Sequence, residues 1–152
     1  MGKKQIKGMV DVSHKKVTKR KAIAASTIVL GNKAFEALVK DRSPKGNVLE
    51  TAKTAALLAA KNTFQIIPMC HPLNLNQVLV DFRLDKKKKS VTATVEVNYE
   101  GKTGVEMEAL LGAAVACLTI YDMMKWADKG MFLEETKLIY KSGGKSGTYK
   151  RD

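Results

Sequence analysis

The chain contains few cysteines, few aromatic residues and few acidic residues. Two cysteines among 152 residues exclude a framework of disulfide bonds and fit a reducing compartment such as the cytoplasm. Aromatic residues make up only 6% of the chain, which leaves few rings for stacking on nucleic-acid bases. Acidic residues number 15 against 27 basic ones, so the formal net charge is +12 at pH 7 and an anionic partner is expected.

The sequence also lacks a long uncharged apolar run. Residues 1–12 are basic and have no apolar core of a signal peptide, and the most apolar stretch, within 103–125, contains Glu, Asp and Lys. We therefore expect a single domain over residues 1–152 without a membrane-spanning segment. Residues 1–21 are expected to form a basic N-terminal arm, and residues 142–152 a tail rich in glycine and lysine.

The patterns of apolar residues predict an α+β fold. Strands are expected over residues 22–30, 78–84, 91–97 and 132–141. Helices are expected over residues 33–39, 47–63 and from about 105 to 125, with Asn47 as the cap of the second. A hairpin turn at residues 86–89 and short connections favour a ferredoxin-like sandwich, a four-stranded antiparallel sheet with helices on one face.

The last of these helices is apolar in its middle and charged at its ends. Steps of three and four residues place six side chains on one face, namely Glu108, Leu111, Val115, Leu118, Asp122 and Lys125. Because buried charge is costly unless it is paired or used, we expect this packed stripe to form the wall of a site. Glu108 and Asp122 are separated by about 21 Å of helix, so a small ligand that contacts both requires two subunits.

Two prolines enclose a thiol and an imidazole in the sequence Pro68-Met69-Cys70-His71-Pro72. A rigid loop can present His71 to a phosphate or a leaving group, and a turn with a hydrogen-bonded histidine is an equal alternative. Cys70 has no orienting base beside it, which disfavours a nucleophilic role. With His14 as the only other histidine, a metal site made of cysteine and histidine is not expected.

Lysines flank two other segments that could bind anions. Residues 141–147, KSGGKSG, lack the leading glycine and the following helix of a Walker motif, so an anion nest and a flexible basic tail both remain open. Lys45 precedes a helix N-terminus, where backbone N–H groups favour anions, although a solvated lysine is the simpler interpretation of that residue alone.

Six motifs follow one another along the chain: MVDVS (9–13), KGNV (45–48), IPMCHPL (67–73), KTGVEMEAL (102–110), LTIYDMMK (118–125) and KSGGKSG (141–147). Taken in this order, they resemble the cyclic pyranopterin monophosphate synthase family, the molybdenum-cofactor biosynthesis protein C family. The resemblance spans nearly the whole chain. It implies a phosphorus–oxygen lyase that converts 3′,8-cyclo-7,8-dihydroguanosine 5′-triphosphate to cyclic pyranopterin monophosphate and releases diphosphate, an early step of molybdenum cofactor biosynthesis. It further implies a cytoplasmic homohexamer, a trimer of dimers with its active site between subunits, and no redox cofactor. Assistance by Mg²⁺ stays open, although no set of ligands in the sequence demands a metal.

The resemblance also implies roles for individual residues. It implies catalytic roles for Asp122, Lys45 and Lys125. The implied substrate-binding residues are Met69, Cys70, His71, Met107, Glu108, Glu106, Lys141, Arg20 and Asp11. The chain departs from the family pattern at Asn47, Asn62, Met69, Ala56 and Trp126, and the last of these replaces a small residue.

The implied chemistry suits these groups. A lysine whose pKa is lowered by neighbouring lysines can act as acid and base near neutral pH. Asp122 and Lys125, one helical turn apart, can pair and tune each other. The candidates for stabilising charge on the diphosphate leaving group are His71, Lys141, Lys145 and Arg20.

Two other classes of protein deserve comparison. A basic RNA-binding module would suit the sheet and the charge, but the hairpin strands offer only Phe82 and Tyr99 for stacking, and no RNP-like motif is present. A non-catalytic assembly subunit would explain the apolar helix but not its charged ends. We therefore expect a GTP-derived triphosphate as the anionic partner, in place of nucleic acid or a membrane.

Overall fold

The computed structural model describes residues 2–152, so Met1, the first residue of the expected arm, lies outside the described residues. The elements in chain order are β1 (Thr18–Val29), α1 (Asn32–Val39), α2 (Val48–Lys61), α3 (Thr63–Ile66), β2 (Gln77–Asp85), β3 (Ser90–Gly101), α4 (Glu106–Met124), β4 (Phe132–Ser142) and β5 (Tyr149–Lys150). The predicted α+β class is confirmed. Asn47 caps α2 as expected, because its side chain accepts a hydrogen bond from the Glu50 N–H at 3.0 Å.

One antiparallel sheet, in the order β2-β3-β1-β4-β5, contains all five strands. The expected number of four strands is wrong, because β5 adds to the edge of the sheet through the pairs Tyr140↔Lys150 and Lys141↔Tyr149. Part of the expected tail therefore belongs to the sheet. The expected arm is also too long, since β1 begins at Thr18, which pairs with Gly101 of β3. The ferredoxin-like classification stays a prediction.

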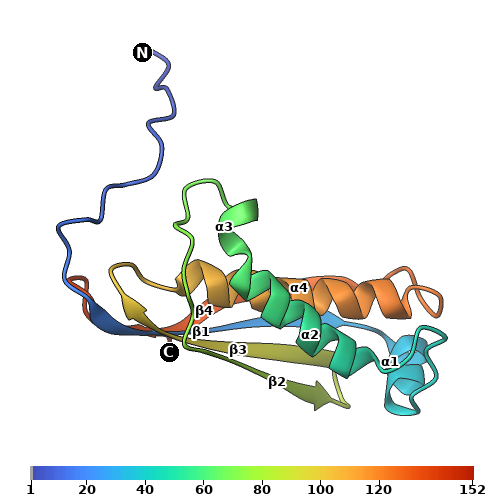
Figure 1. Cartoon of the computed structure of the whole chain (residues 1–152). Coiled ribbons are helices and arrows are strands. Elements are labelled where there is room, and N and C mark those ends of the chain that lie inside the picture. Colours follow the sequence, from blue (N-terminus) through green and yellow to red (C-terminus); the bar gives the residue numbers. More distant parts are fainter. Residues whose placement is uncertain (1) are drawn as a thin grey trace.

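Helices α2 and α4 cover one face of the sheet (Figure 1). The strands present alternate side chains to these helices, and in β3 the buried set is Val91, Ala93, Val95 and Val97. Small residues let the layers approach closely. A β-carbon at Gly112 of α4 would lie 3.3 Å from both the Ala56 carbonyl oxygen of α2 and a methyl group of Val95. The core thus fixes the position of α4 tightly at its middle.

The opposite face of the sheet is polar. The Thr27 and Thr92 hydroxyl groups hydrogen-bond across β1 and β3 at 2.8 Å, and Lys137 pairs with Glu135 at 2.7 Å. Phe82 and Tyr99 pack against the hydrophobic core. Both rings considered for RNA stacking are therefore engaged elsewhere, which removes the support for that alternative.

The charged stripe of α4 is largely exposed, which corrects the expectation that the chain itself packs it. Of its six residues only Glu108 is buried, at 4% exposure, whereas Leu118 is 54% exposed and Asp122 is open to water. The physical reason is that the close approach of the sheet selects the face with small side chains, formed by Ala109, Gly112, Ala113, Ala116 and Cys117. Helix α4 is long and apolar enough to cross a membrane by length and composition, but half of its most apolar window is buried inside the structure, as in a core helix.

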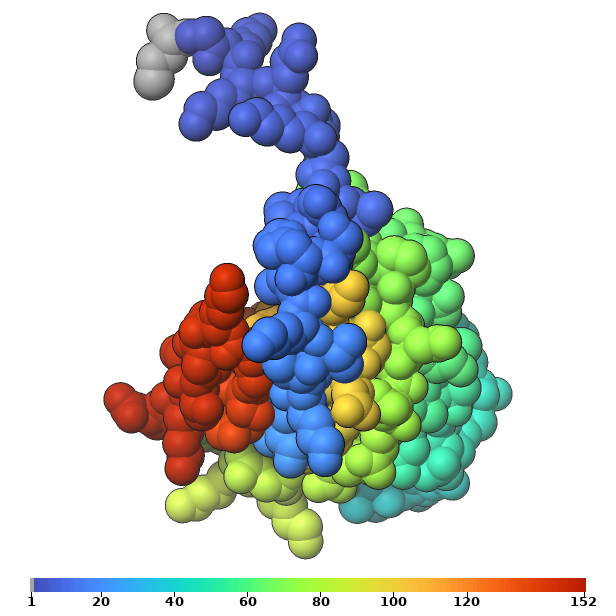
Figure 2. Space-filling model, turned by 60° about the vertical axis from the view of Figure 1, so that its left-hand side comes forward, coloured from blue at the N-terminus to red at the C-terminus, as the bar shows by residue number. Residues whose placement is uncertain are grey.

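The N-terminal arm, residues 2–17, extends from the body of the molecule (Figure 2). Two hydrogen bonds attach its later part to the body. His71 Nε2 lies 2.8 Å from the Val10 carbonyl oxygen, and Lys102 Nζ donates to the Ser13 carbonyl oxygen at 3.1 Å. The arm is thereby held next to the loop that precedes β2.

Candidate functional site

A cluster of two lysines and one aspartate lies at the C-terminal end of α4. Lys45 comes from the loop before α2, which the Ser43 hydroxyl ties to α4 by donating to the Met123 carbonyl oxygen at 3.1 Å. Lys45 Nζ donates to Asp122 Oδ2 at 3.0 Å, and Lys125 Nζ donates to Asp122 Oδ1 at 2.8 Å. Each carboxylate oxygen therefore has its own ammonium partner, and all three predicted catalytic residues meet.

Within this lysine–aspartate cluster, the pKa values of Asp122 and Lys125 are shifted by their neighbours. Hydrogen bonds from Lys125 and then Lys45 lower the pKa of Asp122 below its ordinary value. The hydrogen bond to Asp122 raises the pKa of Lys125 above its ordinary value. The expected mutual tuning of Asp122 and Lys125 is confirmed. Lys125 is therefore not a lysine with a lowered pKa of the kind considered above, because the adjacent carboxylate of Asp122 stabilises its charged form.

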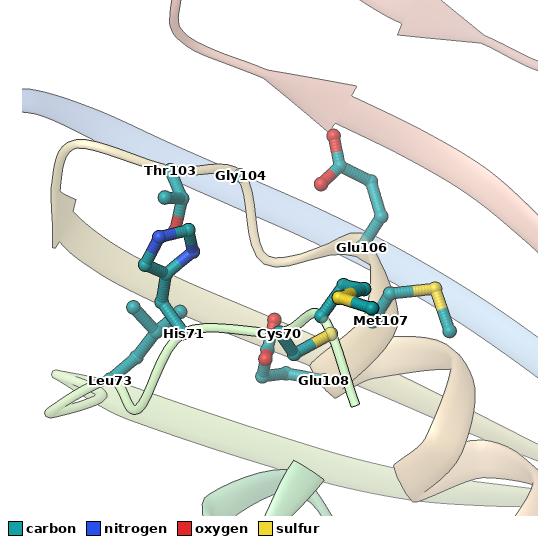
Figure 3. A pocket seen from close by; sticks show the side chains of 9 residues that line it. Cys70, His71, Leu73, Thr103, Gly104, Glu106, Met107 and Glu108 are labelled. Atoms are coloured by element: carbon teal, nitrogen blue, oxygen red, sulfur yellow. The ribbon is translucent and has the colours of Figure 1, made fainter. Parts of the chain in front are cut away.

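A pocket of about 170 Å³ lies at the opposite, N-terminal end of α4 (Figure 3). Its wall combines the loop before β2 with the turn that enters α4, and it brings together six of the predicted binding residues. The lining is formed by Met69, Cys70, His71, Leu73, Thr103, Gly104, Glu106, Met107 and Glu108. Thr103 and Leu73 were not singled out from the sequence, although both lie within motifs of the family resemblance.

Glu108 has the most perturbed carboxyl group of this α4 pocket. Burial raises its pKa from the ordinary 4.5 to about 7, and repulsion from Glu106 acts in the same direction. Burial and the charge of Glu108 also raise the pKa of the Cys70 thiol. Figure 3 shows Cys70 beside Glu108, while the Glu106 carboxyl group points away from both. Glu108 can thus give or accept a proton near neutral pH. Cys70 stays a protonated thiol, which agrees with the prediction that it is not a nucleophile.

His71 uses one ring nitrogen within the chain. A carbonyl oxygen can only accept, so the 2.8 Å contact with Val10 places a proton on Nε2. The alternative of a hydrogen-bonded histidine is therefore observed, and a role toward substrate stays a prediction. Asp11, on the arm, accepts a hydrogen bond from the Ser13 N–H at 2.9 Å, and this bond lowers the pKa of Asp11.

A basic hollow of about 460 Å³ forms where the tail folds back against β1. Its lining residues are His14, Lys15, Lys16, Thr18, Arg20, Gly144 and Lys145. Arg20 is buried, and its Nε donates to the Gly101 carbonyl oxygen at 3.4 Å. Lys141 Nζ is held by the Ser146 hydroxyl and by the Gly143 carbonyl oxygen. The segment KSGGKSG is thus held by its own hydrogen bonds and borders the basic hollow, and its role as an anion nest stays a prediction.

The glycines of this tail make room for Arg20. Gly143 has φ +94° and Gly144 has φ +80°, which is the left-handed region that favours glycine. A β-carbon at Gly144 would collide with the Arg20 guanidinium, and one at Gly143 would collide with the Lys19 carbonyl oxygen. Thr18 was not predicted, yet its buried hydroxyl has no hydrogen-bond partner among residues 2–152. No sequence pattern marks such a group.

Within one chain the predicted residues thus form separate groups. The lysine–aspartate cluster and the α4 pocket lie at opposite ends of a 19-residue helix, and Glu108 and Asp122 are about 21 Å apart along its axis. One small ligand cannot span that distance, so a site shared between subunits stays a prediction. Among the described residues, no group of three His, Cys, Asp or Glu side chains could hold a metal ion.

The fold and these groups define an α+β protein that carries a cluster of paired acidic and basic side chains and a separate basic hollow. Comparison with known proteins identifies the family to which the chain belongs. The MoaC family matches residues 9–144, and the chain therefore belongs to that family.

Curated relatives match almost end to end. The chain is 51% identical over 146 residues to the cyclic pyranopterin monophosphate synthase of Staphylococcus carnosus, covering 95% of this chain and 90% of that protein. The protein of the same name from Helicobacter hepaticus is 47% identical over 144 residues, covering 95% and 91%. That from Desulfatibacillum aliphaticivorans is 49% identical over 141 residues, covering 93% and 89%. The relatives bear the name of a synthase, which is an enzyme.

Proposed function

We propose that this chain converts 3′,8-cyclo-7,8-dihydroguanosine 5′-triphosphate to cyclic pyranopterin monophosphate and diphosphate, as a phosphorus–oxygen lyase of molybdenum cofactor biosynthesis. The observation that carries the proposal is the lysine–aspartate cluster, in which Lys45 and Lys125 each bind one oxygen of Asp122. Family membership and the names of the relatives support the same reaction.

The ring rearrangement needs groups that donate and accept protons at several nitrogen and oxygen atoms. Lys125, whose pKa is raised, stays a cation at neutral pH and can stabilise negative charge that develops on the substrate. Asp122, whose pKa is lowered, stays a carboxylate that orients both ammonium groups. Glu108, with a pKa of about 7, supplies a group that exchanges protons near physiological pH.

The cyclic phosphate forms when a sugar-derived hydroxyl attacks the α-phosphorus. A new P–O bond forms, the bond from the α-phosphorus to the bridging oxygen of the leaving group breaks, and the hydroxyl proton passes to a basic group of the site. Negative charge then grows on diphosphate, and positive side chains stabilise it. The basic hollow with Arg20 and Lys145, and the neighbouring Lys141, are suited to this task.

The separation of the groups along α4 supports an assembly in which two subunits complete one site. We propose a cytoplasmic homohexamer, a trimer of dimers, that needs no redox cofactor. The exposed stripe of α4, with Leu118 54% exposed, supports contact with a second copy. A GTP-derived triphosphate accounts for the positive charge of the chain.

The direct test is incubation of the purified protein with the cyclised GTP derivative, with mass detection of the pyranopterin and enzymatic detection of diphosphate. Lys45→Ala should abolish both products while leaving the oligomer mass and the circular dichroism spectrum unchanged. Lys137→Ala is the matched control, because Lys137 also pairs with a carboxylate but on the polar face of the sheet. Lack of product from folded wild-type protein, or full turnover by Lys45→Ala, would refute the proposal.

A further inference from the structure

Trp126 is the only tryptophan of the chain and follows α4 directly. Its side chain is 47% exposed, although tryptophan is a residue that proteins usually bury for the most part. It is adjacent in sequence to Lys125 and four residues beyond Asp122. A large exposed ring beside the charged cluster calls for a function.

The backbone around Trp126 is fixed. The Lys125 N–H donates to the Tyr121 carbonyl oxygen at 2.9 Å, and the Ala127 N–H donates to the Met124 carbonyl oxygen at 2.9 Å. Ala127 and Met124 are themselves buried. The indole ring is therefore attached to a rigid turn, not to a mobile loop.

Trp126 lies in the turn that follows α4, two residues beyond the last helical residue, Met124. Lys125, between them, still has helical backbone angles, φ −61° and ψ −19°. The indole and the Asp122 carboxylate therefore belong to the same end of α4. Lys45 reaches the same carboxylate from the loop before α2.

No other interaction in the described chain uses the indole. Among residues 2–152, its N–H makes no hydrogen bond, and the two cation–π contacts found involve other rings. By comparison, the Tyr121 hydroxyl donates a hydrogen bond to the Lys129 carbonyl oxygen at 2.9 Å. The indole N–H and the exposed 47% of the Trp126 side chain are therefore available to a ligand.

We propose that Trp126 is a positioning residue that stacks against the fused, planar ring of the purine-derived substrate beside the lysine–aspartate cluster. The inference rests on the proposed function, and it adds a specificity element for the base that the charged residues alone do not provide. Aromatic stacking holds a ring without fixing its hydrogen-bonding edges. Those edges stay free for proton exchange with the cluster while the ring is held in register.

The first experiment measures steady-state kinetics of Trp126→Ala and Trp126→Phe with the cyclised GTP derivative. Loss of the ring should raise KM about tenfold with kcat changed less than about threefold, and phenylalanine should restore KM to within about threefold of wild type. Phe132→Ala is the matched control, since Phe132 is 54% exposed at the start of β4, and its KM should equal that of wild type. An unchanged KM in Trp126→Ala would overturn the inference.

The second experiment uses the wild-type protein and does not depend on the folding of a variant. Because there is one tryptophan, emission excited outside the tyrosine band reports Trp126 alone. Addition of the substrate should quench this emission saturably, and inorganic triphosphate, which has no ring, should not. The inference would be overturned if the emission intensity did not change when substrate is added during turnover, or if it changed equally with inorganic triphosphate.

The outcomes separate the two proposals. Absence of turnover by wild-type protein denies the proposed function itself. Normal turnover with an insensitive Trp126 denies only the stacking role. A Trp126→Ala variant that loses oligomer mass, and whose KM returns to the wild-type value when the protein is concentrated, shows that the ring contacts a second copy instead, and this also overturns the stacking role.

Discussion

The two ends of α4 hold carboxyl groups in opposite environments. At the N-terminal end Glu108 is buried in the pocket with Cys70, and its pKa rises to about 7. At the C-terminal end Asp122 lies in water between two lysines, and its pKa falls. One helix thus carries a carboxyl group poised to exchange a proton and another held as an anion. The surroundings, and not the helix, decide between the two behaviours.

The largest expected effect is at the exposed end. Asp122→Asn keeps the shape of the side chain but removes the charge that binds both lysines. We expect kcat to fall about a thousandfold, as for loss of a general acid–base group, while the melting temperature barely changes because the ion pairs are exposed. Kinetics and thermal unfolding of the same preparation check this. A large drop in melting temperature would show that Asp122 is chiefly structural.

The next effect concerns the pH dependence of stability at the buried end. Between pH 4.5 and 7 the folded chain keeps the proton on Glu108 that the unfolded chain loses, so the free energy of unfolding falls as pH rises through this window. The loss is on the order of 2–3 kcal/mol at pH 8. Glu108→Gln cannot ionise, so it should gain stability relative to wild type between pH 5 and pH 8.

Denaturant unfolding at both pH values measures this gain, and Glu134→Gln is the control because Glu134 is exposed on β4, outside the α4 pocket. Equal pH dependence in wild type and Glu108→Gln would contradict the burial argument. It would also erase the contrast between the two ends of α4.

A third change tests whether the position of α4 controls the groups at both of its ends. Gly112→Val adds side-chain atoms where a β-carbon would already lie 3.3 Å from Ala56 and Val95. Overpacking should cost about 1–3 kcal/mol and displace α4, so that turnover falls as well. Gly112→Ala is the control, because helix propensity offsets most of the tight contact. Thermal unfolding and kinetics measure both effects. If the Gly112→Val protein is as stable and active as wild type, the helices and the sheet can move apart at little cost.

The smallest expected effect is at the cap that positions Lys45. Asn47→Ala removes the acceptor for the Glu50 N–H and should destabilise α2 by about 1 kcal/mol. Asn47→Asp keeps an acceptor and should stay within a few tenths of a kcal/mol of wild type. Chemical denaturation measures both. If the two variants lose the same stability, the cap does not hold the loop that carries Lys45.

Much of the fold could be predicted because its signals are local. Alternation along 91–97 marks β3, and Asn47 marks the start of α2, since both depend on neighbours in sequence. The two residues of β5 carry no periodicity and form a strand only because β4 offers a free edge. Periodicity also identified the stripe of α4, but it did not show whether this stripe faces the sheet or the solvent. The preference of the sheet for small side chains decides which face is buried.

The site was less accessible to sequence reasoning. Lys45 and Asp122 are 77 residues apart, and no local pattern announces their contact, so both came from the family resemblance. The raised pKa of Glu108 depends on the loop that carries Cys70, and the raised pKa of Lys125 depends on the geometry of Asp122. Such properties arise from tertiary neighbours and become visible only when the chain is folded.

The fit of Arg20 against the two glycines of the tail has an evolutionary consequence. Because any larger residue at Gly144 would collide with the guanidinium, and one at Gly143 with the backbone of β1, the order in which mutations arise matters. A larger side chain at Gly144 becomes tolerable only in a lineage that has already lost the arginine. A change at codon 20 should therefore precede any change at codon 144, where the φ of +80° continues to favour glycine, and this order makes the pair a marker for following the descent of the site.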